Sequence, residues 1–422
     1  MNRSRRLVLF DPGLASAVGH HSDVNNLLLP ALQQRSWQVE LWADAQASND
    51  PALKAQLPEL RPFLHNGGYI DPRHWCDLPG TLHQAALLRS QLAAAVAAEP
   101  SPVAAWVAHS LVPFQLIALA QLLQHQPPAK VVISLMFAPS EVFAGQPELD
   151  LHAQRLGAGL NARSAVAAVG MAASRGGHQL LLGAGSEQLI QRYAPLCAAA
   201  GLPPPQLHPS LVGGHEWLAP PEQAPAQIML HWGERKPDKG RELALAVLEQ
   251  LLEGPALPEL LARAQWCFHA ASRQPPPPAE AELLHRASQH ERIRVLEGAL
   301  PRATMLQELA RSSAALLPYC PLAYAERSSG VLWLYGAARL ACARPAPVVG
   351  YGDGWLAAEA PALGLPWQAL PQGARAVDAL AALAQVLQLP LGACLVTPYG
   401  QQVLGSNWGS WLADCLDADI LS

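Results

Sequence analysis

The sequence has little charge and lacks the features of nucleic-acid-binding and disulfide-rich proteins. Only 14% of the residues are charged and the formal net charge is −5, without a basic tail or stripe, so no nucleic-acid partner is expected. The seven cysteines are scattered and form no CxxC pair. This spacing argues against a zinc site and a disulfide framework, and it fits reduced thiols in a cytoplasmic protein.

Long hydrophobic runs are also missing. No stretch approaches the ~18 apolar residues that a membrane span needs, and the apolar run LVLF near the N-terminus is too short for a secretion signal. We therefore expect a soluble cytoplasmic protein with no transmembrane segment. The sequence leaves peripheral contact with a membrane surface open.

Half of the 422 residues are apolar, which suits two domains of roughly 200 residues, each with its own core. Short, continuous apolar runs alternate with helical patterns, as in parallel sheets that are covered on both faces. The runs that predict strands are 6–11, 38–43, 103–109, 130–137, 164–170, 227–232, 264–270, 293–298, 314–319 and 346–351.

A proline-rich connector divides this pattern. Residues 202–225 combine prolines with two glycines, and proline removes hydrogen-bond donors and fixes the backbone, so this segment predicts a domain boundary. We expect an N-terminal Rossmann-like domain over residues 1–215 and a C-terminal Rossmann-like domain over 216–404. A final helix over 405–422 has no assigned packing partner. The predicted fold is α/β, with two doubly wound domains that face a cleft.

A cluster of cations follows the first predicted strand of the C-terminal domain. The stretch HWGERKPDKGREL places Arg235 and Lys239 between that strand and a helix, with Gly240 at the helix start. Strand ends and helix starts of such sheets bind anions, so the two cations predict a phosphate or diphosphate site. The alternative is a solvated turn in which Glu234 and Asp238 pair with the cations. The turn matches neither a Walker A loop nor GxGxxG.

A second anion-friendly helix start lies in the same predicted domain. Ser328, Ser329 and Gly330 follow the fourth strand and open the next helix, where free backbone N–H groups and two hydroxyls are expected to gather. Two such turns beyond strand ends of one domain can serve one ligand. The alternative for the serines is an ordinary helix cap.

These stretches resemble the nucleotide-sugar-binding domain of GT-B-fold glycosyltransferases, in particular the retaining group 4-like enzymes. That family has a turn similar to G-R-x-x-x-x-K-G after the first strand of the C-terminal domain, and this sequence has Gly233, Arg235, Lys239 and Gly240. It also has a strand, a loop, a Gly-led helix and a strand reading P-V-V, which LLPYCPLAYAERSSGVLWLYGAARLACARPAPVV resembles. The N-terminal LVLFDPGLASAVGHHSDVNNLLLPAL is similar to the family's opening strand, glycine-rich loop and helix.

One family feature is absent. The family carries two glutamates eight residues apart, with a glycine three residues after the first. Anchored on Gly330, these places hold Arg327 and Tyr335, and Glu326 lies one place away. In the family the second glutamate commonly holds the donor's ribose, so the resemblance leaves the ribose contact of this chain unassigned.

The resemblance implies transfer of a sugar from a nucleotide-diphosphate sugar to an acceptor that the sequence does not identify. Arg235 and Lys239 would receive the departing diphosphate, with help from the N–H groups of Ser329 and Gly330, because preorganised charge stabilises the transition state. No metal and no cofactor besides the nucleotide sugar is expected. Retention of configuration is implied as well.

The resemblance also singles out polar residues near the expected cleft. His109 ends a predicted strand and would touch the transferred sugar or the acceptor, while Gly19 and His20 lie on the loop that approaches the diphosphate. Asp353 lies in the tight turn GYGDG and would meet a sugar hydroxyl. The alternatives are a structural histidine, a helix-capping region and a plain turn.

Two other functions fit the same sequence. The missing glutamate pair is compatible with a non-catalytic GT-B-like protein that binds a ligand or partner. A sugar-nucleotide epimerase on the same architecture is the other alternative. Release of nucleotide from a sugar donor distinguishes the transferase from the binding protein, and recovery of an altered sugar nucleotide would indicate the epimerase.

Overall fold

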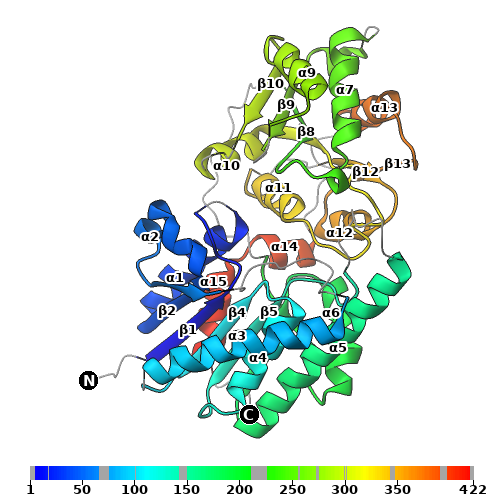
Figure 1. Cartoon of the computed structure of the whole chain (residues 1–422). Helices are drawn as coiled ribbons and strands as arrows, with labels where there is room; N and C mark the ends of the chain where they lie inside the picture. The colour runs from blue at the N-terminus through cyan, green and yellow to red at the C-terminus, as the bar shows by residue number, and fades with distance from the viewer. Residues whose placement is uncertain are drawn as a thin grey trace. The chain divides into compact units, whose positions relative to one another are not determined.

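The computed structural model describes residues 5–17, 19–65, 76–99, 101–141, 150–210, 226–254, 257–271, 275–298, 300, 302–342, 347–389 and 397–418. The chain forms two compact α/β units (Figure 1). Unit 1 comprises Met1–Val212 and Asn407–Ser422, and unit 2 comprises Gly213–Ser406. The expected boundary after residue 215 lies in 211–225, outside the described residues.

The sheet of unit 1 has seven parallel strands in the order β3-β2-β1-β4-β5-β6-β7. Its central strands are buried on both faces, which explains their continuous apolar sequences. The order reverses between β1 and β4, and ligands of doubly wound sheets bind at this reversal. The strands are β1 (Arg5–Asp11), β2 (Trp37–Asp44), β3 (Leu60–Leu64), β4 (Ala105–His109), β5 (Lys130–Leu135), β6 (Gln179–Ala184) and β7 (Gln206–Leu207).

Helices cover both faces of this sheet. One core joins α3, α4, α5 and α6 to the sheet, and a second core joins α1 and α15 to the other face. The longer helices are α1 (His20–Gln34), α3 (Leu78–Ala98), α4 (Pro113–Leu123), α5 (Leu151–Gly176), α6 (Glu187–Ala199) and α15 (Trp408–Asp417). Two short elements, η1 (Ala45–Asn49) and α2 (Pro51–Gln56), follow β2.

Unit 2 repeats the doubly wound design with six parallel strands in the order β10-β9-β8-β11-β12-β13. The order reverses between β8 and β11. The strands are β8 (Gln227–His231), β9 (Gln265–Ala270), β10 (Ile293–Glu297), β11 (Ser312–Leu316), β12 (Val348–Tyr351) and β13 (Trp367–Leu370). The helices are η3 (Pro237–Lys239), α7 (Arg241–Glu253), α8 (Glu259–Ala262), α9 (Pro278–Ser288), α10 (Arg302–Arg311), α11 (Gly330–Ala341), α12 (Trp355–Leu363), α13 (Ala376–Val386) and α14 (Pro398–Leu404).

The two-domain, doubly wound α/β fold is confirmed, but one predicted strand is wrong. Residues 164–170 lie inside α5, where buried residues recur at helical spacing, for example Asn161, Ala165 and Val169. The apolar run was too short to separate a buried strand from a buried helix, and its alanines favour the helix. The strand that follows β5 is β6, which was not predicted.

The C-terminal helix belongs to unit 1. Asn407 caps α15 by accepting hydrogen bonds from the N–H groups of Gly409 and Ser410, and Gly409 packs against the backbone of α1. Trp408, Leu412 and Leu416 enter the core that also contains α1. Helix α1 continues through Pro30 to Gln34. Among the described residues, no helix is long and apolar enough to cross a membrane.

Candidate functional site

The two predicted anion-binding turns meet in unit 2, where the strand order reverses. The turn after β8 contains η3, and the loop after β11 begins at Leu317. The backbone N–H of Cys320, in the second loop, donates a hydrogen bond of 2.8 Å to the carbonyl of Asp238 in the first. The carboxyl end of the sheet at its switch point therefore brings together the sequence segments that carried the phosphate hypothesis.

Gly240 makes this close approach possible. Its φ of 66° lies in the left-handed region, and a β-carbon there would overlap the carbonyl group of Pro318. Only glycine avoids both the conformational strain and the overlap. The glycine thus fixes the start of α7 against the loop that follows β11.

We predict that Gly240→Ala lowers the free energy of unfolding by about 3 kcal/mol, because it combines backbone strain with a backbone overlap. Gly373→Ala is the matched control, since Gly373 has a φ of 71° but no atom near its missing β-carbon. That variant is expected to lose only about 1 kcal/mol. Urea unfolding measures both values, and equal losses would contradict the packing role of Gly240.

Lys239 ends η3 and points its ammonium toward the backbone of Gly233. A β-carbon on Gly233 would lie 2.9 Å from Nζ. Burial, followed by repulsion from Lys236, lowers the pKa of Lys239 to about 8. No carboxylate within the described part of the chain forms an ion pair with this ammonium. The site therefore holds a largely buried ammonium that Asp238 and Glu234 attract at longer range but that no described carboxylate contacts as an ion pair.

Arg327 links the second turn to the first. Its Nη1 donates a 2.7 Å hydrogen bond to Oδ2 of Asp238, and its guanidinium lies 5.3 Å from the ring centre of Tyr324. Tyr324 in turn contacts Tyr319, whose ring centre lies 6.0 Å from Nζ of Lys239. The aromatic pair thus separates two cations that approach from different loops.

The remaining cations of the turn have partners of their own. Lys236 is half-exposed and pairs with Glu234 at 3.2 Å. Arg235 turns toward the β9–α9 side, where it donates to the carbonyl of Pro275 and lies 3.5 Å from Glu280. The alternative, in which Glu234 and Asp238 pair with the cations of the turn, thus describes Lys236 but not Arg235, whose partner is Glu280, nor Lys239. A phosphate contact by Arg235 stays a prediction.

The Ser-Ser-Gly turn contains the ordinary helix cap that the sequence left as an alternative. Ser329 is buried, and its Oγ accepts a hydrogen bond from the N–H of Leu332. Ser328 and Gly330 flank this cap and are partly exposed, as is Glu326. The hydroxyl of Ser329 therefore orders the start of α11, while a ligand role of Ser328, Gly330 and Glu326 stays a prediction.

A third loop, after β12, joins the same edge of unit 2. The N–H of Trp355 donates a 2.7 Å hydrogen bond to the carbonyl of Tyr324. Gly354, with a φ of 91°, packs on this carbonyl and on Pro321. Asp353 precedes it and is exposed. The expected sugar contact of Asp353 is untested, but its loop touches the loop that carries Arg327.

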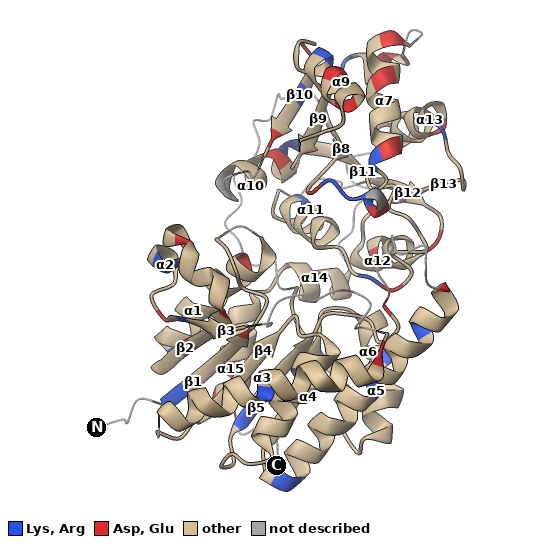
Figure 2. Cartoon of the chain, in the orientation of Figure 1, with Lys and Arg blue, Asp and Glu red and all other residues tan. Residues whose placement is uncertain are grey.

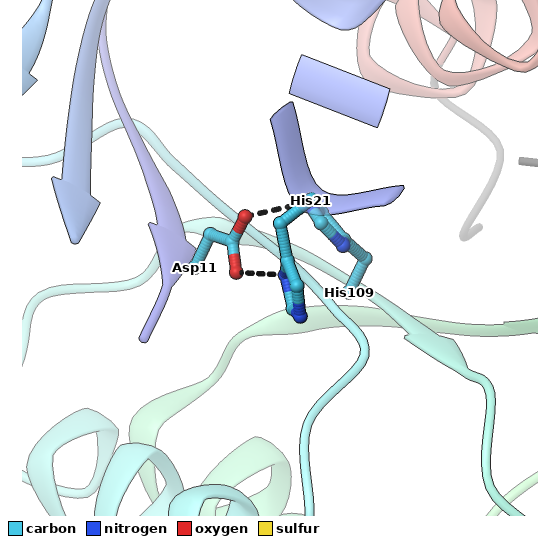
Figure 3. Close-up of side chains that lie close together, drawn as sticks. All are labelled: Asp11, His21 and His109. Atoms are coloured by element: carbon cyan, nitrogen blue, oxygen red, sulfur yellow. Dashed lines mark hydrogen bonds and ion pairs between the residues drawn. The ribbon is translucent and has the colours of Figure 1, made fainter. Parts of the chain in front are cut away.

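In unit 1 a buried polar cluster occupies the corresponding reversal between β1 and β4 (Figure 3). Asp11 ends β1, His109 ends β4, and His21 and Asn25 come from the first turns of α1. One oxygen of Asp11 lies 2.6 Å from Nδ1 of His21, and the other accepts from Asn25 at 2.6 Å and lies 3.4 Å from Nε2 of His109. The carboxylate thus connects three elements.

The charges of this cluster follow from its contacts. Burial raises the pKa of Asp11, but the two histidines and the hydrogen bonds from His21 and Asn25 outweigh it, so the pKa is well below its usual value. Burial lowers the pKa of His109 to about 4, against the opposing effect of Asp11. At neutral pH, Asp11 is therefore ionised and His109 is neutral.

His109 is fully buried, and both of its ring nitrogens have protein partners. Nδ1 lies 3.1 Å from Oγ of Ser110, and Nε2 lies 3.3 Å from Oδ1 of Asn25. Ser110 has a positive φ of 56°, which is unusual for a residue with a side chain. These contacts assign His109 a positioning role toward Asp11 and Asn25, and its predicted contact with a sugar is untested.

Asp11, His21 and His109 each offer one ligand atom within 4.8 Å of the others, and two imidazoles with a carboxylate are a donor set that zinc accepts. Both oxygens of Asp11, however, already form hydrogen bonds of 2.6 Å. These three side chains and Asn25 are therefore already joined in one hydrogen-bonded network.

The glycine loop before α1 shapes this cluster. Gly19 has a φ of 116° and precedes the helix, and the rings of His20 and His21 lie 4.0 Å apart. Gly13 has no side chain where the ring of His21 packs. A diphosphate contact of Gly19 and His20 stays a prediction, whereas His21 is held by Asp11.

Sequence reasoning missed Asp11, Asn25 and Tyr319, and it did not identify Arg327 as the partner of Asp238. A usable signal existed for Asp11, because an acidic residue that ends an apolar strand at a sheet's ligand-binding edge is unusual. Tyr319 is the last residue of the predicted strand 314–319. Nothing in the sequence pairs Asp238 with Arg327, since 89 residues separate them.

No family model matches the chain, and a search of curated proteins finds no match. Solved structures do resemble it. An E. coli protein described as trehalose-6-phosphate bound with UDP-2-fluoro glucose has a TM-score of 0.56 at 14% identity, covering 99% of each chain. The UDP-forming trehalose-phosphate synthase of Burkholderia xenovorans has a TM-score of 0.55 at 13% identity, covering 98% of this chain and 99% of its own.

A third similar structure is a UDP-N-acetylglucosamine 2-epimerase from Listeria monocytogenes, designated as such without experimental proof. Its TM-score is 0.53 at 12% identity, and the match covers 97% of this chain and 94% of the other. At these identities the likeness concerns the fold and not the reaction. The two parallel sheets with interleaved helices thus give this chain the two-domain α/β architecture of the GT-B fold.

Proposed function

We propose that the protein is a glycosyltransferase that binds a nucleotide-diphosphate sugar in unit 2 and transfers the sugar to an acceptor. The observation that carries the proposal is the position of the Lys239 ammonium, which lies beside the backbone of Gly233 at the switch point of the sheet and forms no ion pair with a carboxylate of the described residues. Desolvation of a lone charge is unfavourable, so such a charge indicates a missing counter-ion. A diphosphate supplies that counter-ion.

The fold comparisons support a nucleotide sugar as the ligand. One similar structure contains UDP-2-fluoro glucose, and another is a UDP-forming synthase. These ligands belong to those proteins. They agree with what the residues of this chain suggest, because Lys239, the backbone N–H groups at the start of α11 and the half-exposed Ser328 lie on loops that meet at one edge of unit 2.

The chemistry that these residues can perform is stabilisation of the leaving group. Cleavage of the bond between the sugar and the diphosphate places negative charge on the phosphate oxygen, and a preorganised ammonium lowers the energy of that state. Lys239 is the principal group in this role. Arg235 supplies a second cation if its guanidinium leaves Glu280, and Arg327 pairs with Asp238. The proposal includes retention of configuration and independence of metal.

The ribose contact differs from that of the resembling family. Tyr335 is buried and its hydroxyl points to the carbonyl of Pro347 at 3.5 Å, while Arg327 pairs with Asp238. Neither can replace a ribose-binding glutamate in this arrangement. Glu326 is the remaining acidic residue in the turn and is our candidate.

The similarity to an epimerase structure makes a sugar-nucleotide epimerase the second candidate function. An epimerase would also place a nucleotide diphosphate against Lys239, so the phosphate site does not distinguish the two reactions. The reaction products distinguish them. A transferase releases the nucleoside diphosphate only with transfer to an acceptor or to water, whereas an epimerase returns an altered sugar nucleotide.

Thermal shift tests the phosphate site directly. A nucleoside diphosphate, tested for each base, is expected to raise the melting temperature more than the matching monophosphate, because a ligand that binds only the folded state stabilises it in proportion to occupancy. A sugar donor incubated with a lysate as acceptor source is then assayed for released nucleotide. If no diphosphate shifts the melting temperature, the proposed site is wrong. Binding without release of nucleotide or change of the sugar would support a non-catalytic protein.

A further inference from the structure

A buried carboxylate in unit 2 lies between two arginines. Glu280 is in the first turn of α9, and its side chain is only 9% exposed. Its Oε1 accepts hydrogen bonds from Nε and Nη2 of Arg241, at 3.1 and 2.5 Å, and its Oε2 lies 3.5 Å from Nε of Arg235. Basic and acidic residues follow one another along the turn between β8 and α7, which contains Arg235 (Figure 2). One carboxylate therefore pairs with two cations.

The two ion pairs of Glu280 are unequal. The side chain of Arg241 is 6% exposed, and its guanidinium lies 5.1 Å from the ring centre of Phe268. A buried cation of this kind depends on its anion. The side chain of Arg235 is 28% exposed, and its distance to Glu280 is longer. Because long, partly exposed ion pairs contribute little, Arg235 can leave Glu280 while Arg241 keeps the carboxylate in place.

The backbone of Arg235 is fixed, so only its side chain has to move. Its N–H donates a 2.8 Å hydrogen bond to the carbonyl of Ala271, which follows β9. The ammonium of Lys239 lies beside Gly233, two residues before Arg235 in the same turn. Rotation of the Arg235 side chain can therefore bring its guanidinium toward an anion that Lys239 binds.

We propose that Glu280 holds the guanidinium of Arg235 on the β9–α9 side in the ligand-free protein, and that Arg235 leaves Glu280 for the diphosphate when this ligand binds. Without an anion, the cations of the turn repel one another, and Arg235 is more stable beside Glu280. A diphosphate carries more negative charge than a carboxylate that already pairs with Arg241, and its oxygens match the fork of guanidinium donors. Glu280 is thus a positioning residue that acts on the ligand through Arg235.

This inference rests on the proposed diphosphate site and adds to it a residue that sets when the second cation becomes available. The alternative is a structural triad, in which Arg235 stays beside Glu280 after the ligand has bound. The two arrangements differ in one measurable property. Only in the proposed one does the charge of Glu280 change the contribution of Arg235 to anion binding.

Calorimetric titration of the full chain with inorganic pyrophosphate tests the proposal, because this probe has no base to select. Arg235→Ala is expected to weaken binding about tenfold, through loss of a charge-assisted contact. Glu280→Gln keeps an oxygen for Arg241 but removes the charge, and it should strengthen binding about threefold, because Arg235 no longer has to leave an ion pair. In the Glu280→Gln protein, Arg235→Ala should then weaken binding about thirtyfold.

Glu282→Gln is the matched control. It removes the same charge from an exposed position of α9, two residues after Glu280. In that protein, Arg235→Ala should still weaken binding about tenfold. A difference between the two backgrounds therefore reports the contact of Arg235 with Glu280 and not the net charge of the helix.

A second measurement uses the unchanged protein and does not depend on the folding of a Glu280 variant. With isotope-labelled arginine, the Nε–H nuclear magnetic resonance signal of Arg235, identified by its loss in Arg235→Ala, should move during the pyrophosphate titration, while that of Arg241 stays in place. Equal effects of Arg235→Ala in all backgrounds, or a fixed Arg235 signal, would overturn the inference. The diphosphate site survives that result if Lys239→Ala still weakens binding. If the unchanged protein does not bind pyrophosphate, the inference fails, and the thermal-shift test with nucleoside diphosphates decides separately on the proposed function.

Discussion

Replacement of Lys239 by alanine is expected to lower turnover of the nucleotide-sugar donor by at least about 100-fold, the typical loss when one preorganised charge contact to a transition state is removed. The reason is geometric. The ammonium lies beside Gly233 at the switch point of the sheet, where no side chain of the described residues forms an ion pair or a hydrogen bond with it. The other two cations of the turn, Arg235 and Lys236, form ion pairs with Glu280 and Glu234.

Lys236→Ala is the matched control for this variant. Lys236 lies three residues earlier in the same turn, but it is half-exposed and paired with Glu234. Its loss should change turnover less than about threefold, since exposed ion pairs contribute little. Release of nucleoside diphosphate at saturating donor measures both variants. Equal, small effects of the two substitutions would remove the assigned role of Lys239 and with it the observation that carries the proposed function.

Replacement of Lys239 by an uncharged residue should not weaken the fold. Because the pKa of Lys239 falls from 10.5 to about 8 in the folded state, the unfolded chain binds more protons between these values. The lysine therefore lowers stability below pH 8, and stability recovers as the pH rises from 8 toward 10.5. Lys239→Met is expected to raise the free energy of unfolding at pH 7 by about 2 kcal/mol. Lost turnover with gained stability would separate a ligand role from a structural one.

Most strands of both sheets could be predicted from the continuous apolar runs, because parallel strands that are buried on both faces have such sequences. The run at 164–170 failed for the same reason, since a buried stretch of α5 has a similar composition. The sequence placed Lys239 and the Ser-Ser-Gly turn at strand ends. It could not show that Arg235 faces Glu280 or that Arg327 faces Asp238, because these pairs depend on how loops from distant segments pack.

The contacts of the buried cluster in unit 1 could not be predicted from the sequence either. The resemblance pointed to His109 as a group that touches a sugar, which stays a prediction, but it did not indicate that His109 is fully buried with two protein partners. The residue that organises this reversal is Asp11, which contacts side chains from both neighbouring elements. Removal of a buried carboxylate with three polar partners would leave those buried partners without the group that they contact.

Asp11→Ala is accordingly expected to lower the free energy of unfolding by about 3–5 kcal/mol, the cost of removing one partner from a buried charged network. The side chains of His21 and Asn25 would then keep buried polar groups without their acceptor. Urea unfolding at pH 7 is the suitable measurement, because His109, with its pKa at about 4, is neutral there.

Asp77→Ala provides the comparison. Asp77 also accepts a hydrogen bond, from the N–H of Gly80 at the start of α3, but it is exposed, so its loss should cost only about 1 kcal/mol. Asp11→Asn retains the shape of the side chain while it removes the negative charge, and it should fall between the two. If Asp11→Ala costs no more than Asp77→Ala, then Asp11 does not hold β1, β4 and α1 together at the reversal, and the positioning role of His109 is wrong with it.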